Sequence, residues 1–203
     1  MLPDGNKNFD NEPGLNLTGR ELLNMSAGSL VFYLFIATLL FYFFHDNGLF
    51  DAFTHGYSFG LQVLIGVLSG AAAAGVILFF STRKPVAPIL DDFTLFRIIK
   101  KTKFTWFDRT QVSLFAGVGE ELLFRGAIQP LIGIWLTSLI FIAIHGYVSF
   151  RSAGHILFTL LLFGLSMMLG YLFIYAGLVA AMTAHAVYDL LMLWWVKWLP
   201  SED

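Results

Sequence analysis

The sequence contains no cysteine among its 203 residues. It therefore has no disulfide framework, no thiolate zinc site, no cysteine nucleophile and no iron–sulfur cluster. Charged residues make up only 13% of the chain, roughly half the fraction usual in soluble domains. A net charge of −2 argues against a nucleic-acid-binding protein. With 57% hydrophobic residues, the chain has too few polar residues to cover the surface of an ordinary water-soluble globule.

Long apolar segments dominate the sequence instead. Six of them come close to the ~20 residues that a helix needs to cross a bilayer. They cover about residues 27–44, 59–80, 112–131, 134–150, 155–175 and 178–196. The sequence therefore predicts an all-α, polytopic membrane helix bundle of about six transmembrane helices, forming a single membrane domain over residues 1–203. Residues 1–24 are expected to form an N-terminal cytoplasmic tail, in which Thr18 and Glu21 have the spacing of a capping box that opens a helix.

The basic residues predict how this bundle is oriented. Eleven of the 12 Lys and Arg residues fall on one side of the membrane if the six segments alternate in direction. The positive-inside rule makes that side cytoplasmic and places both termini there. Seven of these residues lie within residues 81–111, where they are mixed with aromatic and aliphatic residues. We expect this basic amphipathic segment to lie on the membrane interface, with a substrate gate as the alternative.

Six ionisable side chains interrupt the apolar segments: Glu120, Glu121, Arg125, His145, His185 and Asp189. A charged group at this depth costs roughly 2.5–3.5 kcal/mol, so these residues must form pairs or face a wet cavity. Glu121 and Arg125 are four residues apart on one helix, which predicts a supporting ion pair. Glu120 is turned by about 100° from Glu121 and is expected to face elsewhere.

The remaining four groups have matching depths in the membrane. Glu120 lies ~12 Å from the cytoplasmic end of its segment, His145 ~8 Å, Asp189 ~11 Å and His185 ~17 Å, at a rise of 1.5 Å per residue. All four therefore lie in the cytoplasmic half. Residues far apart in the sequence are predicted to meet at one point, on the catalytic helices of residues 112–196.

Three motifs carry a resemblance to a known family. They read E-E-x-x-x-R at residues 120–125, F-x-x-x-H at 141–145 and H-x-x-x-D at 185–189. In this order, on three predicted membrane helices, they resemble the CAAX protease and bacteriocin-processing (CPBP, or abortive-infection) family, which is related to the type II CAAX prenyl endopeptidases. The resemblance covers about residues 112–189 and implies an intramembrane peptidase. Asp189 stands where the eukaryotic prenyl proteases carry Asn.

The residue types fit the hydrolysis of a peptide bond in a membrane. A partly desolvated Glu can serve as a general base, so we expect Glu120 to activate water with the help of His145. His185 is expected to donate a hydrogen bond to the developing oxyanion. Asp189 would orient His185 or, if it is protonated, donate beside it. The resemblance assigns the same four residues to the catalytic site.

The sequence leaves alternatives open for the cofactor, the partners and the class of function. Glu120, His145 and His185 form a donor set that could also hold one zinc ion, so either no cofactor or one divalent metal is expected. The expected partners are the lipid bilayer and a membrane-associated, prenylated or peptide-precursor substrate, in a bacterial cytoplasmic membrane. A proton or divalent-cation transporter that uses the same buried cluster is the first alternative, and a non-catalytic membrane scaffold is the second.

Overall fold

The computed structural model describes residues 17–199, and in this range every regular element is a helix. The predicted all-α fold is therefore confirmed. Four helices are long and apolar enough to cross a membrane: α1 (Gly19–Phe44), α2 (Phe59–Ser81), α7 (Ala153–Tyr175) and α8 (Leu178–Trp195), which continues through η5 (Val196–Trp198). The total of six spans and the cytoplasmic position of the termini stay predictions.

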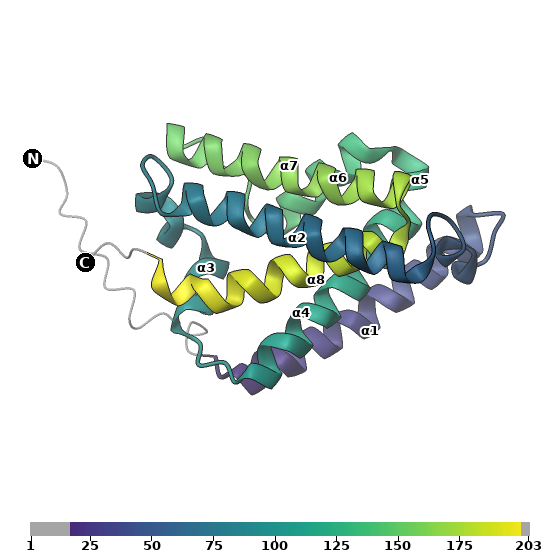
Figure 1. Ribbon diagram of the computed structural model, residues 1–203, viewed down its shortest axis with the longest axis horizontal. Coiled ribbons are helices and arrows are strands. Elements are labelled where there is room, and N and C mark those ends of the chain that lie inside the picture. Colours follow the sequence, from purple (N-terminus) through teal and green to yellow (C-terminus); the bar gives the residue numbers. More distant parts are fainter. Residues whose placement is uncertain (1–16, 200–203) are drawn as a thin grey trace, which may run out of the picture.

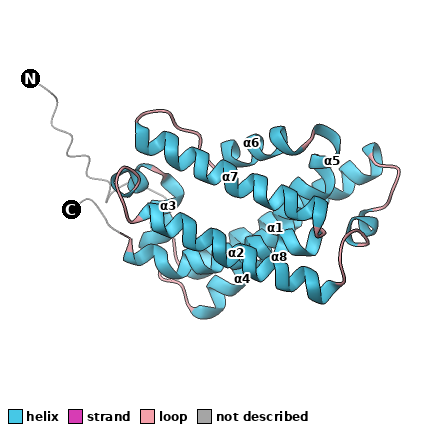
Figure 2. Ribbon diagram, turned by 45° about the horizontal axis from the view of Figure 1, so that its top comes forward, coloured by secondary structure: helices cyan, strands magenta, loops and turns pink. Residues whose placement is uncertain are grey.

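The third apolar segment folds as one continuous helical stretch in three parts. These are α4 (Trp106–Glu121), the π-helix η4 (Leu122–Ile128) and α5 (Gln129–Ile132). The shorter elements are η2 (Leu49–Phe53), η3 (Ala87–Asp92), α3 (Thr94–Lys101) and α6 (Ile134–Ile144). Figure 2 shows that short loops join most of these helices.

One predicted boundary is wrong. The fourth apolar segment was expected to stay helical to residue 150, but α6 has only 11 residues. It ends in a Schellman motif, in which the N–H groups of Gly146 and Tyr147 donate to the carbonyls of Ala143 and Ile142, both at 3.0 Å. Gly146 has φ +74°, which glycine adopts without a Cβ penalty. At a 1.5 Å rise per residue, α6 reaches across only about half of the hydrocarbon core.

The helix start predicted at Thr18 lies within the expected cytoplasmic tail of residues 1–24, which stays a prediction. α1 already begins at Gly19, because Thr18 caps it: the Thr18 hydroxyl accepts from the Glu21 N–H and the Glu21 carboxylate accepts from the Thr18 N–H. The capping box predicted from the sequence is therefore confirmed. Residues 1–16 of the predicted tail lie outside the described residues.

Helix α8 lies at the centre of the bundle and contacts α2, α4 and α7 (Figure 1). Glycines allow the close approach on two sides. A Cβ added to Gly66 of α2 would lie 2.7 Å from the carbonyl oxygen of Ala180, and one added to Gly117 of α4 would lie 2.7 Å from that of Met182. The small residues of the sequence thus bring two neighbouring backbones against α8.

The basic segment forms the end of the bundle beside η5, and η2 and α5 lie at the other end (Figure 1). Helix α3 presents Phe96 inward, where its ring packs 5.7 Å from the ring of Phe158 on α7. Lys100 and Asp91 form an ion pair at 3.2 Å. The apolar side of this segment therefore closes one end of the core.

Candidate active site

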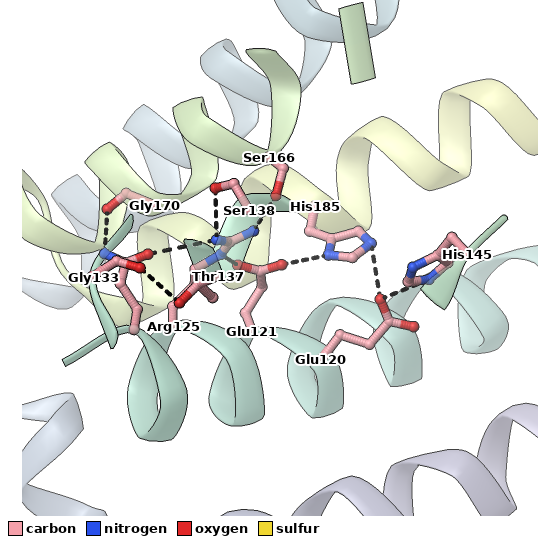
Figure 3. Close-up of polar contacts among 11 residues, drawn as sticks. Glu120, Glu121, Arg125, Gly133, Thr137, Ser138, His145, Ser166, Gly170 and His185 are labelled. Carbon is pink, nitrogen blue, oxygen red and sulfur yellow. Dashed lines mark hydrogen bonds and ion pairs between the residues drawn. The ribbon is translucent and has the colours of Figure 1, made fainter. Parts of the chain in front are cut away.

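The two adjacent glutamates end helix α4 and point to different partners (Figure 3). Both are buried, with 8% of Glu120 and none of Glu121 exposed. The π-helix η4 begins at the next residue, Leu122. Such π-helical turns are rare and are frequent at functional sites.

Arg125 anchors the end of α4 from inside the protein. It is fully buried, and its Nε donates to Oε2 of Glu121 at 3.0 Å, which confirms the predicted i, i+4 ion pair. Its two terminal nitrogens donate to the hydroxyls of Ser138 on α6, at 3.4 Å, and Ser166 on α7, at 2.8 Å. One buried guanidinium group therefore connects three helices.

Glu121 also fixes the ring of His185. Its Oε1 lies 2.8 Å from Nδ1 of His185, although 64 residues separate the two in sequence. A carboxylate only accepts hydrogen bonds, so Nδ1 carries a proton. Nε2 of His185 lies 3.5 Å from Oδ2 of Asp189 and 4.0 Å from Oε2 of Glu120. The sequence predicted that Asp189 would orient this ring, whereas the shortest contact to it comes from Glu121.

His145 approaches Glu120 from the end of α6. The Schellman motif leaves it at the C-cap position, where Nδ1 donates to the carbonyl of Phe141 at 2.7 Å. This backbone bond turns Nε2 toward Oε2 of Glu120, 3.4 Å away (Figure 3). The ring of Tyr147 lies parallel to that of His145 at 6.0 Å. The end of α6, and not its middle, therefore supplies the imidazole.

All four predicted catalytic side chains line one cavity of about 310 Å³: Glu120, His145, His185 and Asp189. The rest of its wall is largely apolar and comes from α1, α3, α4, α6, α7 and α8. Oε2 of Glu120 is buried and has no hydrogen-bond partner within the described chain. A buried carboxylate oxygen that faces two imidazoles is poised to accept a proton or to hold a water molecule.

The same geometry bears on Glu120, His145 and His185 as possible ligands of a zinc ion. Within residues 17–199, no group of three or more His, Asp or Glu side chains has an arrangement that could hold a metal ion. The residues as they lie do not fit the zinc ion that the sequence left open as an alternative to a metal-free site. Their contacts with one another are those of hydrogen-bonded and charged pairs.

Sequence reasoning missed several residues that complete the site. Tyr33, Tyr147 and Tyr188 line the cavity, and each brings a phenol group into its largely apolar wall. Ser138 and Ser166 hold Arg125. The available signal was a hydroxyl side chain inside an apolar segment, but such residues are common in membrane helices and no spacing rule connects them to Arg125.

The fold defines an integral membrane protein, with four long apolar helices and a polar cluster among them. A comparison with known protein families agrees with an integral membrane protein. Residues 102–191 match the family model described as type II CAAX prenyl endopeptidase Rce1-like. The resemblance predicted from the three motifs is confirmed over this region, which contains all of them.

A curated relative also matches part of the chain. The uncharacterized protein YpbD of Bacillus subtilis (strain 168) is 38% identical over 79 residues, which are 38% of this chain and 40% of the relative. The alignment thus spans less than half of either protein. No solved structure gave a significant match.

Proposed function

We propose that this protein is an intramembrane endopeptidase that hydrolyses a peptide bond with a water molecule activated by Glu120 and His145. The observation that carries the proposal is the buried Oε2 of Glu120, which has no hydrogen-bond partner within the described chain and faces the Nε2 atoms of two histidines at the wall of one cavity. The match of residues 102–191 to an endopeptidase family supports the same reaction class.

The proposed reaction uses each group once. A water molecule beside Glu120 attacks the scissile carbonyl carbon, and its proton passes to the Glu120–His145 pair. The carbonyl oxygen becomes an oxyanion, which accepts a hydrogen bond from Nε2–H of His185. The proton held by Glu120 and His145 then moves to the amide nitrogen, the C–N bond breaks, and a carboxylic acid and an amine leave.

Glu121 and Arg125 hold the ring of His185 in its orientation. Glu121 accepts from Nδ1 of His185, so Nε2 donates into the cavity when the ring is an imidazolium with a proton on each nitrogen. Arg125 holds Glu121 in turn. In this proposal Asp189, 3.5 Å from Nε2, stabilises the positive charge of the His185 imidazolium before it donates.

The cavity wall favours a substrate that is itself membrane-associated. Apolar side chains such as Met25, Phe96 and Phe115 make up much of it. We propose a lipidated or otherwise membrane-anchored peptide as the substrate and a bacterial cytoplasmic membrane as the location. The relative from Bacillus subtilis supports this location.

The test is the Glu120→Gln variant, assayed on a fluorogenic peptide anchored to detergent micelles by a farnesyl group. Loss of the general base should lower the cleavage rate by about 10²–10⁴-fold while the thermal unfolding curve stays unchanged. Asp51→Asn is the matched control, because Asp51 is a carboxylate at the opposite end of the bundle, where it caps η2. Full cleavage by Glu120→Gln would contradict the proposal and leave the transporter and the scaffold as explanations.

A further inference from the structure

A second cavity, of about 550 Å³, lies on another side of α8 from the candidate active site. It is a groove whose walls come from α2, α4, α8 and the loop that precedes α2. Apolar side chains line most of it, among them Leu114, Val118, Val187 and Leu190. Its volume falls in the range of sites that hold a small molecule.

A cation lies at one end of this groove. Arg109 precedes Ser113 by one helical turn on α4, and Trp194 follows Leu190 by one turn on α8, so both extend faces that line the groove. The Arg109 guanidinium carbon lies 5.3 Å from the centroid of the Trp194 ring. The ring of Trp106 packs edge-on against Trp194 at 5.4 Å. This end of the groove therefore combines a positive charge with two indole rings.

Arg109 has no acidic partner in the part of the chain that the structure describes. No carboxylate there lies within ion-pair distance of it, and its Nε is buried without a hydrogen-bond partner. It belongs to the basic segment of residues 81–111, which the positive-inside rule places at the cytoplasmic leaflet. The planar guanidinium fits a carboxylate or a phosphate, and the phosphate of an anionic lipid is the anion that the cytoplasmic leaflet supplies.

We propose that this groove binds one anionic glycerophospholipid of the cytoplasmic leaflet. Its phosphate pairs with Arg109, its glycerol region lies beside Trp106 and Trp194, and an acyl chain follows Leu190 and Leu114 into the groove. The cation and the two indole rings lie together at one end and the apolar wall follows, as the polar headgroup region and the acyl chains follow one another in a phospholipid. An apolar transmembrane helix in the same groove would leave Arg109 without an anion.

Native mass spectrometry of the full chain in mild detergent tests the charge of the headgroup. The probes are phosphatidylglycerol, which is anionic, and phosphatidylcholine, which has no net charge. One equivalent of phosphatidylglycerol should bind about fivefold more tightly than phosphatidylcholine. This is the difference in affinity that one basic residue near an anionic headgroup contributes. Arg109→Gln should abolish this preference. Arg83→Gln is the matched control, since Arg83 also stacks on an aromatic ring, that of Phe79, at 4.2 Å.

A second pair of variants tests the position of the acyl chain. Leu114→Trp fills the groove and should weaken the binding of both lipids, whereas Leu68→Trp places the same ring on an exposed face of α2 outside it and should not. Equal binding of the two lipids by the wild type would overturn the proposal. So would an equal loss of the preference for phosphatidylglycerol in Arg83→Gln and Arg109→Gln. So would a dimer of this chain that Leu114→Trp dissociates, because a second copy would then occupy the groove.

Discussion

Replacing Arg125 with Met should destabilise the protein more than any exposed substitution. Arg125 and Glu121 are both fully buried and form an ion pair at 3.0 Å. Methionine fills most of the volume of the arginine side chain but leaves the Glu121 carboxylate without its cation. The hydroxyls of Ser138 and Ser166 lose their donor at the same time. The cost therefore comes from an uncompensated buried charge and not from a cavity.

The size of the effect follows from the burial of both partners. Breaking a buried ion pair by removing one partner costs about 3–5 kcal/mol. For a chain of this length each kcal/mol lowers the Tm by roughly 2–4 °C, so a decrease of about 6–20 °C is expected. The double variant Glu121→Gln/Arg125→Met removes both charges and should recover about half of that loss or more.

Differential scanning fluorimetry in detergent, which follows the tryptophans, measures both variants. Arg83→Met serves as the control, because this arginine is exposed and its loss strands no buried carboxylate. A Tm for Arg125→Met equal to that of the control would refute the reasoning. A double variant as unstable as the single one would show that packing, and not the charge on Glu121, sets the cost.

Two further predictions concern metal and packing. If Glu120 and His145 activate water without a metal, cleavage should persist after dialysis against a chelator, and elemental analysis should find substoichiometric zinc; activity restored only by added zinc would contradict this. Gly66→Leu should lower the Tm by several degrees, because its Cβ would lie 2.7 Å from the Ala180 carbonyl and overpacking costs about 1–3 kcal/mol. Gly60→Leu on the same helix has open space around it and should leave the Tm unchanged.

Much of the local structure could be predicted from short-range patterns. The capping box at Thr18 and the ion pair between Glu121 and Arg125 depend only on residues three or four apart. The prediction that α6 continues to residue 150 was wrong because apolar composition alone was used. Gly146 was the missed signal, since a glycine after an apolar run commonly ends a helix in a left-handed conformation.

The candidate site was predictable as a set of residues but not as a set of contacts. Depth along each helix indicated that Glu120, His145 and His185 would meet, and the structure brings them together at one cavity. The pairing of Glu121 with His185 was not predicted. Depth gives one coordinate along the membrane normal, whereas a hydrogen bond also depends on how each helix is rotated about its axis.

The sequence by itself determined that this chain enters a membrane and that its few buried charges must find partners, because both conclusions follow from the cost of placing charge in hydrocarbon. It also determined the order of the three motifs on their helices. Only the tertiary structure decided which partners meet. The glycine contacts of α2 and α4 with α8 set the positions from which Glu120 and His185 face one cavity. Such contacts join residues far apart in the chain, and no local pattern in the sequence encodes them.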